Sequence, residues 1–518
     1  MTRLVVAAAA ALLLVACATP SPEGTAPRPL DPATLGTGDG LSAADWPAHD
    51  WWQAFGDPAL DALVSQALAK APTLAVAQAR VARATALQAG TGAAHAPQLG
   101  LSAEATDQRF TAKGLIPPPV AGSTAWTASL QVGAAWSPDL AGGQRAALQA
   151  AIGQRRAAEA DQQAARVLIA GQVAAAHFQL AALLDQRTVL TAAEAQRGQV
   201  AALVAERRAA GLDTEIDLQQ ARGQVAQARA QGLALDDAIA RARHALAELT
   251  GQGPEALLAY APTLAVPRPL AAHRPLPADL LGRRADLVAA RWRVEAATAG
   301  TAEARAAFYP SVNLSAFVGL SSLGLDRLLD LGARQYGAGP ALHLPLFDGG
   351  RLQAQLDGRR AEVGAAVAAY DSALLRALRE VADELGTQRA LVARQAAQAE
   401  ATAAAEQAYA LALARYRAGL GNYLVVLTAQ SNVLLQQQAA SDLRGRRLAT
   451  DVALILALGG GFGPDDGAPP ATKAATAATA ATAATAATAA TAATAATAAT
   501  AATPASATKA PDSGKNPT

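Results

Sequence analysis

The sequence predicts a mainly α-helical protein that also contributes strands to a transmembrane β-barrel. Long segments rich in Ala, Gln and Arg contain no proline, which is typical of very long helices. Four other stretches alternate apolar with polar residues, as the strands of a membrane barrel do. Both patterns occur twice in the same order, so the 518 residues form an internal repeat rather than a string of independent domains.

The N-terminus has the features of an exported lipoprotein. Arg3 precedes an apolar run that begins at Leu4 and is too short for a membrane-spanning helix, so we interpret residues 1–16 as a signal peptide. The residues LVAC before and at Cys17 resemble the lipobox, in which the cysteine becomes the acylated N-terminus. Cys17 is the only cysteine, so it cannot form an internal disulfide. Ala18 follows it, which by the same resemblance implies sorting to the outer membrane.

Two terminal segments lack a pattern that could form a core. Residues 17–45 are rich in Pro and Gly and are interpreted as a tether. Residues 464–518 contain ten Ala-Ala-Thr triplets and have no apolar face to bury, so we expect a disordered or weakly helical tail.

The repeat relates residues 46–253 to residues 281–463. Thr73–Ala103 aligns without gaps on Asp286–Ala316 at an offset of 213 residues. A Gly-Gly pair follows each predicted hairpin and precedes a long helical segment. The matched pairs include Leu74/Leu287, Arg80/Arg293, Val81/Val294, Pro97/Pro310 and Leu101/Leu314.

Each repeat contains one predicted β-hairpin, at about residues 98–137 and 311–346. In the first strand the apolar positions are odd-numbered, and they include Leu99 and Leu101. A strand of a soluble β-sandwich would alternate in the same way. Four such strands of roughly 9–11 residues, joined in pairs by longer polar loops, fit the wall of a transmembrane barrel.

The longest helix is expected from about Gln144 to Ala210. Proline is absent between Asp139 and Gly253, and again between Leu346 and Gly463. At 1.5 Å per residue this helix would be on the order of 100 Å long, which is far more than a globular domain needs. Its apolar residues are thinly spread, so the pattern favours a coiled-coil-like sheath.

Two Gly-Leu pairs interrupt the helical segments at matching points, Gly211-Leu212 and Gly419-Leu420. Glycine tolerates the left-handed conformation that ends a helix, and Asp, Thr or Asn just after it can cap the next helix. We therefore predict that the chain reverses at residues 211–214 and 419–422, instead of kinking. Both turns should lie at the same end, far from the hairpins.

With these features, the chain from about residue 45 to residue 463 resembles the TolC/OprM/NodT family of outer-membrane efflux lipoproteins. The resemblance implies a homotrimer in which each chain gives four strands to one shared 12-stranded barrel, extended by a periplasmic α-helical barrel. A belt around its middle would use residues 254–280 and those just after Trp46. The resemblance to the family rests on five motifs, which are the Cys17 lipobox, Leu281–Ala297, Phe308–Ala316, Leu344–Arg351 and Arg415–Gln430.

The resemblance implies a passive outer-membrane duct for drugs or other small molecules. An inner-membrane pump of the RND type and a periplasmic adaptor would supply substrate and energy, and outer-membrane lipid would surround the barrel. Two alternatives remain open from the sequence. One is the outer-membrane duct of a type I protein-secretion system, and the other is a coiled-coil surface lipoprotein without a pore.

The same resemblance assigns the two turns to the periplasmic aperture. Asp217 is the predicted acceptor for the hydroxyl of Tyr416. Some family members carry aspartates just beyond the second turn, whereas this chain has Val425 and Thr428, so a cation-binding ring is not expected there. The predicted aperture residues are Gly211, Leu212, Asp217, Tyr416, Gly419, Leu420, Val425 and Thr428.

No motif for catalysis, a cofactor or a metal occurs in the sequence. The six histidines are isolated from one another, and Asp286 and Asp348 sit in motifs where capping or turn roles are expected. The net charge of +1 predicts no electrostatic attraction to nucleic acid. We therefore expect neither an enzyme nor a nucleic-acid-binding protein.

Overall fold

The computed structural model describes residues 21, 27–30, 35, 46–264 and 284–463. The predicted signal peptide, Cys17 and the predicted tail at 464–518 lie outside the described residues, as does most of the predicted linker at 254–280.

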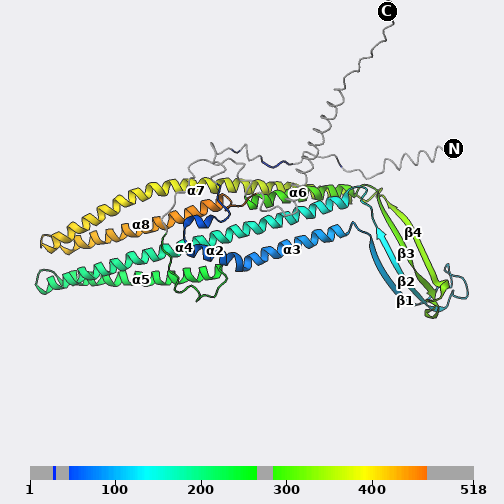
Figure 1. Cartoon of the computed structure of the whole chain (residues 1–518), viewed down its shortest axis with the longest axis horizontal. Coiled ribbons are helices and arrows are strands. Elements are labelled where there is room, and N and C mark those ends of the chain that lie inside the picture. Colours follow the sequence, from blue (N-terminus) through cyan, green and yellow to red (C-terminus); the bar gives the residue numbers. More distant parts are fainter. Residues whose placement is uncertain (1–20, 22–26, 31–34, 36–45, 265–283, 464–518) are drawn as a thin grey trace, which may run out of the picture. The chain divides into compact units, whose positions relative to one another are not determined.

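The helices of the two repeats have equal lengths (Figure 1). The offset between equivalent helices is 213 residues before the hairpins and 208 residues after them, so the second hairpin region is shorter by five residues. These equal lengths confirm the internal repeat. The pairs are α3 (Pro72–Ala93) and α6 (Ala285–Ala306) with 22 residues each, α4 (Gly143–Ala209) and α7 (Arg351–Arg417) with 67, and α5 (Glu215–Leu249) and α8 (Tyr423–Ala457) with 35.

Both long helices begin with the same N-terminal capping arrangement. Gly142 and Gly350 adopt left-handed conformations, with φ of 77° and 88°. The carboxylate of Asp139 accepts hydrogen bonds from the backbone N–H groups of residues 144 and 145, and that of Asp348 accepts from those of residues 350 and 352. These bonds satisfy donors that a helix leaves unpaired at its start. The structural role predicted for Asp348 is therefore confirmed.

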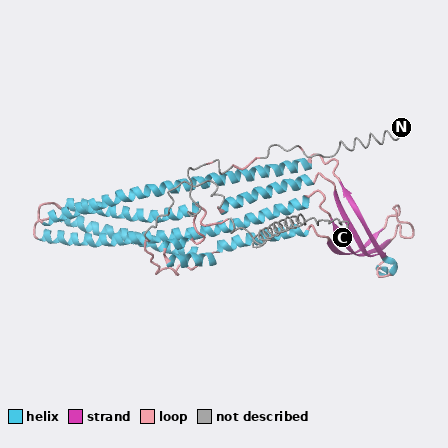
Figure 2. Ribbon diagram, turned by 45° about the horizontal axis from the view of Figure 1, so that its top comes forward, coloured by secondary structure: helices cyan, strands magenta, loops and turns pink. Residues whose placement is uncertain are grey.

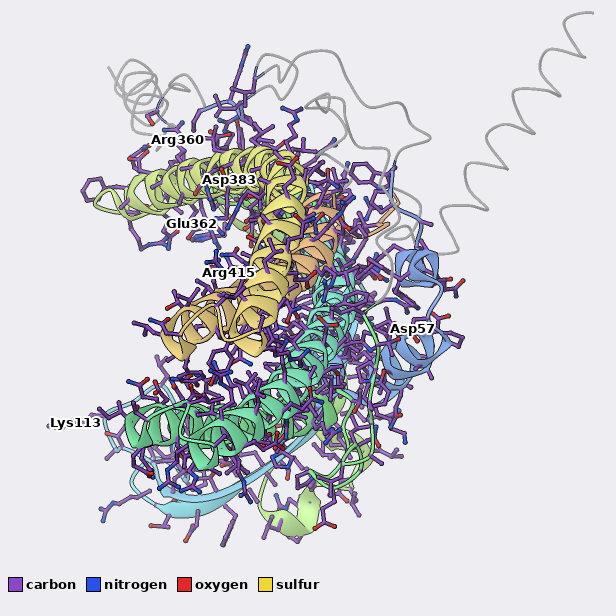
Figure 3. All side chains as sticks on the ribbon, turned by 90° about the vertical axis from the view of Figure 1, so that its left-hand side faces the viewer. Asp57, Lys113, Arg360, Glu362, Asp383 and Arg415 are labelled. Carbon is purple, nitrogen blue, oxygen red and sulfur yellow. The ribbon has the colours of Figure 1, made fainter. Side chains whose placement is uncertain are left out.

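The helices form one layer rather than a bundle around a central core. In the half next to the strands, α4 lies between α3 and α6, and α6 lies between α4 and α7. In the other half, α4 packs against α5 and α8, and α8 packs against α7. Seen from the turn end, the pairs α4–α5 and α7–α8 follow one curved layer (Figure 3). The predicted sheath of long helices is confirmed.

The four strands form one antiparallel sheet in the order β1-β2-β3-β4 (Figure 2). The sheet lies at one end of the helical layer and the two turns lie at the other (Figure 1). The last strand ends three residues before the predicted limit at Leu346, and Pro345 follows, which has no N–H for a sheet ladder. The strands are β1 (Gln98–Arg109), β2 (Thr124–Trp136), β3 (Ser311–Leu323) and β4 (Arg334–His343).

The largest apolar cluster lies around the middle of α4. The 3₁₀ helix η3 (Trp51–Phe55) and helix α2 (Pro58–Lys70) pack there. The imidazole of His177 is fully buried, with its Nδ1 2.8 Å from the Tyr260 hydroxyl and its Nε2 3.0 Å from the Asp57 carboxylate. Burial lowers the pKa of His177 in spite of the Asp57 charge, so this side chain acts as a structural group.

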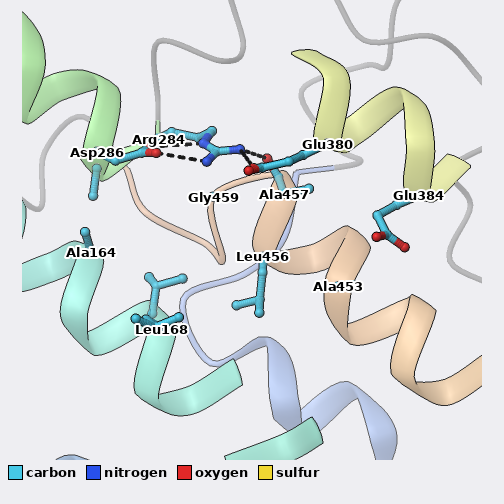
Figure 4. Close-up of a pocket in the computed structure, with 12 residues that line it drawn as sticks. Ala164, Leu168, Arg284, Asp286, Glu380, Glu384, Ala453, Leu456, Ala457 and Gly459 are labelled. Atoms are coloured by element: carbon cyan, nitrogen blue, oxygen red, sulfur yellow. Dashed lines mark hydrogen bonds and ion pairs between the residues drawn. The ribbon is translucent and has the colours of Figure 1, made fainter. Parts of the chain in front are cut away.

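Arg284 joins three helices where α8 ends and α6 begins (Figure 4). Its guanidinium donates to the carbonyl oxygen of Ala457 at 2.9 Å and forms ion pairs with Glu380 at 3.0 Å and Asp286 at 2.9 Å. Burial acts to lower the pKa of Arg284, but the two carboxylates outweigh it and hold the pKa above its usual value. A cation at the last carbonyls of α8 also stabilises the negative end of that helix. The structural role predicted for Asp286 is thus confirmed.

Close packing between α4 and α6 depends on Gly153, and this predicts opposite effects for two Gly→Ala changes in one helix. A Cβ at Gly153 would lie 2.9 Å from the Cβ of Ala296 and 3.1 Å from its Cα, whereas a Cβ at Gly198 would have nothing within 4 Å. We expect Gly153→Ala to destabilise by about 1–3 kcal/mol through overpacking. Gly198→Ala should stabilise by roughly 0.5–1 kcal/mol through helix propensity. Thermal unfolding in detergent followed by circular dichroism measures both, and shifts of the same sign would contradict the packing argument.

Candidate functional site: the barrel wall and the helical tip

One face of the sheet is apolar across all four strands in the rows nearer the helices, and it carries Arg334 and Asp107 only farther along. The register pairs Leu101 with Val132, Val132 with Val318, and Val318 with Tyr336, and directly paired residues share one face. The next row on this face consists of Leu99, Ala134, Ala316 and Ala338. Leu99 and Leu101 are 77% and 70% exposed, although they are large and apolar. A continuous exposed apolar face on strands of 10–13 residues is what a lipid-facing barrel wall requires.

Most residues of the opposite face are polar or glycine. Its rows include Ser102, Gln131, Gly319 and Gln335, and also Glu104, Ser129 and Ser321. This face suits a water-filled interior. The division between the faces follows the period-two pattern of the sequence, so the predicted barrel wall is confirmed as a structural element.

The sheet ends in two unpaired strands, β1 and β4. The helical layer ends on the same two sides, because α3 follows directly into β1 and β4 leads directly into α7. Within the described residues the wall is therefore an open segment with matching edges in its strand and helix parts.

The two Gly-Leu turns reverse the chain through the same backbone arrangement. Gly211 and Gly419 have φ of 75° and 73°. The N–H of Leu212 donates to the carbonyl oxygen of Arg207 at 2.9 Å, and the N–H of Leu420 donates to that of Arg415 at 2.9 Å. This is the Schellman pattern that ends a helix on a left-handed residue. The predicted reversals, both at the end remote from the strands, are confirmed (Figure 1).

Tyr416 links the two repeats at this tip. Its side chain is fully buried, and its hydroxyl donates to the carboxylate of Asp213 in the turn between α4 and α5. Arg207 completes the cluster, because its Nε donates to Asp213 at 3.0 Å and its Nη1 donates to the carbonyl oxygen of Tyr416 at 3.1 Å. The guanidinium carbon lies 4.4 Å from the centroid of the Tyr416 ring. We call Arg207, Asp213 and Tyr416 the tip cluster.

Charge and burial reinforce the tip cluster. Burial and the Asp213 carboxylate raise the pKa of Tyr416, so its hydroxyl keeps the proton that it donates. The hydrogen bond to Asp213 raises the pKa of Arg207. Tyr416 therefore stays neutral and Arg207 stays charged throughout the physiological pH range.

The predicted contact between Tyr416 and Asp217 is wrong. The Asp217 carboxylate accepts from the backbone N–H of Thr214 at 2.9 Å, while the N–H of Asp217 donates to the Thr214 hydroxyl at 3.2 Å. This capping box at the start of α5 occupies the carboxylate locally. Asp213 lies in the turn itself, from which its side chain reaches the other repeat.

The sequence did not predict that Asp213 contacts Tyr416, and it did not indicate that Arg207 belongs to the tip cluster. The Thr-x-x-Asp spacing at residues 214–217 was a signal that Asp217 would be used as a cap. No local signal identified Arg207, because its partner Tyr416 is 209 residues away.

The other predicted aperture residues are exposed at the tip. Leu212 and Leu420 are 65% and 71% exposed, directly after the turn glycines. Val425 is 56% exposed, and Thr428 is exposed with its hydroxyl bonded to the carbonyl oxygen of Leu424. Each tip therefore presents apolar side chains to its surroundings and no carboxylate at positions 425 and 428.

No group of three or more His, Cys, Asp or Glu side chains that could hold a metal ion occurs among the described residues. Two buried groups with shifted pKa values, His177 and Arg284, are engaged in structural contacts between different segments of the chain.

Comparison with known proteins identifies the family of this wall and tip. The sequence matches the family described as outer membrane efflux protein over residues 63–252 and 276–460. It is 32% identical over 434 residues to the multidrug resistance outer membrane protein MdtQ of Escherichia coli O6:H1, which covers 80% of this chain and 89% of that protein. It is 30% identical over 472 residues to MdtP of Shigella flexneri, with 87% and 94% covered.

A solved structure agrees with these relatives. The outer membrane protein VceC of Vibrio cholerae is 38% identical, with a TM-score of 0.76 that covers 81% of this chain and 100% of that chain. The chain belongs to the outer membrane efflux protein family. It is an outer-membrane efflux channel with the TolC-like fold predicted from its sequence motifs. The alternative of a coiled-coil lipoprotein without a pore is thereby excluded.

The division of the sheet predicts that the same substitution has different effects at two neighbouring residues. Val132 lies on the apolar face of β2 and Gln131 lies on the polar face. We expect Val132→Lys to destabilise the folded barrel by about 2–4 kcal/mol, since a lysine would face hydrocarbon, and Gln131→Lys to have little effect. The fraction of each variant that inserts into liposomes in a protease-resistant form measures the difference. Equal insertion of the two variants would contradict the assignment of the faces.

Proposed function

We propose that three copies of this chain close into one channel that passively conducts drug-like small molecules across the outer membrane. The observation that carries the proposal is the pair of matching open edges. Unpaired backbone groups at β1 and β4 are not tolerated in lipid, so β4 of one copy must pair with β1 of the next. Four strands from each of three copies would form a barrel large enough for an aqueous lumen.

The helical edges support the same assembly. Since α3 and α5 lie at one edge of the layer and α7 lies at the other, each copy would pack its α7 against the α3 and α5 side of its neighbour. The helical sheath would then continue the lumen of the barrel toward the periplasm. Relatives named as multidrug resistance proteins support drug-like substrates. Transport of folded or unfolded proteins in a type I system is the alternative.

The tip is the proposed aperture and docking end. The tip cluster holds the α7–α8 turn to the α4–α5 turn within one copy, which would favour a closed tip over one in which the two turns separate. The exposed Leu212 and Leu420 provide apolar contacts for a periplasmic adaptor. An inner-membrane pump acting through that adaptor would supply the energy.

The described residues of the N-terminal tether support anchoring at Cys17. The backbone N–H of Ser21 donates to Gln353 at 3.1 Å, and Arg360 donates to the carbonyl oxygen of Ser21 at 2.9 Å. Both partners lie in the first three turns of α7, directly after the strands. Four residues reach about 14 Å at most, so an acyl chain on Cys17 would enter the leaflet beside the barrel of its own copy.

The tip cluster predicts which carboxylate controls conductance. A hydrogen bond to a charged group contributes about 1.5–3 kcal/mol, and three copies would multiply its effect on the closed state. We expect purified wild-type protein to form trimers with low, mostly closed conductance in planar bilayers. Tyr416→Phe combined with Asp213→Asn should raise the conductance and also raise vancomycin sensitivity in cells.

Asp217→Asn is the matched control for this experiment. Its carboxylate is the N3 acceptor of the α5 capping box, and Asn keeps an acceptor oxygen there, so the change should cost only about 0.3–1 kcal/mol through the lost charge at the helix N-terminus and leave conductance unchanged. Unaltered conductance in the Tyr416/Asp213 variant would remove the tip cluster from the gate. A wild-type protein that stays monomeric and does not insert into bilayers would refute the trimeric channel.

Acylation of Cys17 predicts fatty-acid labelling that depends on one residue. Metabolic labelling should mark the wild-type protein and not Cys17→Ala. Because the barrel also holds the chain in the membrane, the variant should still fractionate with the outer membrane when a signal peptide without a lipobox exports it. Equal labelling of the two proteins would disprove the anchor.

A further inference from the structure

The polar face of the barrel wall carries a single phenylalanine, tyrosine or tryptophan ring. Phe317 is the seventh of the 13 residues of β3, and so it lies halfway along the wall. Its paired residues place it on the face of Gln131 and Gln335. The remaining aromatic residues of β1–β4 are Trp126, Trp136 and Tyr336, and all three lie on the apolar face.

Phe317 is surrounded by glycines. Gly133 is its partner on β2, Gly337 is its partner on β4, and Gly319 follows it on the same face. A Cβ at Gly337 would lie 2.7 Å from Cε1 of the Phe317 ring and 2.9 Å from Cζ, so the ring lies over the backbone of Gly337. A Cβ at Gly133 would have nothing within 4 Å, so the ring does not cover Gly133 and the space above that residue is open. Phe317 is 41% exposed.

Glu104 is the only carboxylate on the polar face of the four strands. It lies in the row of Ser129 and Ser321, four residues farther along β1 than Gly100, which belongs to the row of Phe317. At 3.3–3.4 Å per residue the two rows are about 13 Å apart. Because β1 and β3 are also separated by two strand spacings of about 4.8 Å, the carboxylate lies roughly 16 Å from the ring. At low ionic strength its charge still favours cations in this part of the lumen without contacting the ring.

An exposed ring on a water-facing wall gains little from burial, but its open face is a stacking surface. The face of an aromatic ring carries partial negative charge, so it attracts cations as well as other rings. We propose that Phe317 is a specificity-determining residue of the pore, which transiently binds planar aromatic cations in transit, with Glu104 raising their local concentration. The inference rests on the proposed trimeric channel, in which three copies of Phe317 line the lumen at one depth.

A structural role makes a different prediction. A ring that only shields the glycine backbone would stabilise the sheet and would not discriminate between solutes. The decisive comparison is therefore between an aromatic and a non-aromatic cation on the same channel.

The test uses the purified full-length protein in planar bilayers, with ethidium as the planar aromatic cation and tetraethylammonium as the non-aromatic cation. Blockade events are counted only in channels that conduct, so the state of the tip does not enter. Phe317→Leu keeps an apolar side chain and removes the ring. We expect it to shorten the ethidium blockade about two- to fivefold and to leave the tetraethylammonium blockade unchanged.

Two glycine variants provide the matched control. Gly337→Ala should displace the ring and change the ethidium blockade, whereas Gly100→Ala, in the same row and with nothing within 4 Å of its new Cβ, should not. Glu104→Gln should reduce the preference for cations over anions, measured as a smaller reversal potential in a KCl gradient.

The outcomes separate the two proposals. A wild-type protein that forms no conducting channel refutes the trimeric channel and this inference with it. Conducting channels whose ethidium blockade is the same in wild type and Phe317→Leu overturn the inference alone. Equal loss of blockade for both cations, with a lower trimer yield, assigns Phe317 a structural role and also overturns it.

Discussion

The structure depends on one constraint, which is that backbone N–H and C=O groups inside a membrane must be paired within protein. A single copy meets this requirement between β1 and β2, β2 and β3, and β3 and β4, but not at its outer edges. The helices obey the same geometry, because they form a layer one helix thick with edges on the same two sides. Large exposed apolar side chains on the sheet and small residues between the helices both follow from building a wall rather than a core.

The two repeats have the same backbone arrangement but different side chains. Equivalent helices have the same lengths, and both tips use a left-handed glycine followed by a capped helix. The residues at the tips have diverged: Tyr416 stands at the position of Arg208, and Gly421 stands at that of Asp213. The two turns can bond to each other because their side chains differ. The second repeat supplies the hydroxyl donor, Tyr416, and the first supplies the carboxylate acceptor, Asp213.

In the middle of the molecule the helical wall is thickened by η3 and α2, which pack against α4. Trp51 and Trp52 pack with Ile169 and Phe178 of α4, and His177 is enclosed there between Asp57 and Tyr260. Arg284 ties α6 to α7 and α8 at the same level, where the short helices of the two halves meet end to end.

The sequence by itself determined the elements and their order, because helix length, strand alternation and glycine-ended helices are local patterns. It placed the reversals at Gly211 and Gly419 and the hairpins within a few residues. It did not determine the partner of Tyr416, since Asp213 and Asp217 lie four residues apart and only the packing of α4 against α7 and α8 decides which one the hydroxyl meets. Nor did it bring Phe317 over Gly337, because sheet register is set by pairing between distant strands and not by the pattern within one of them.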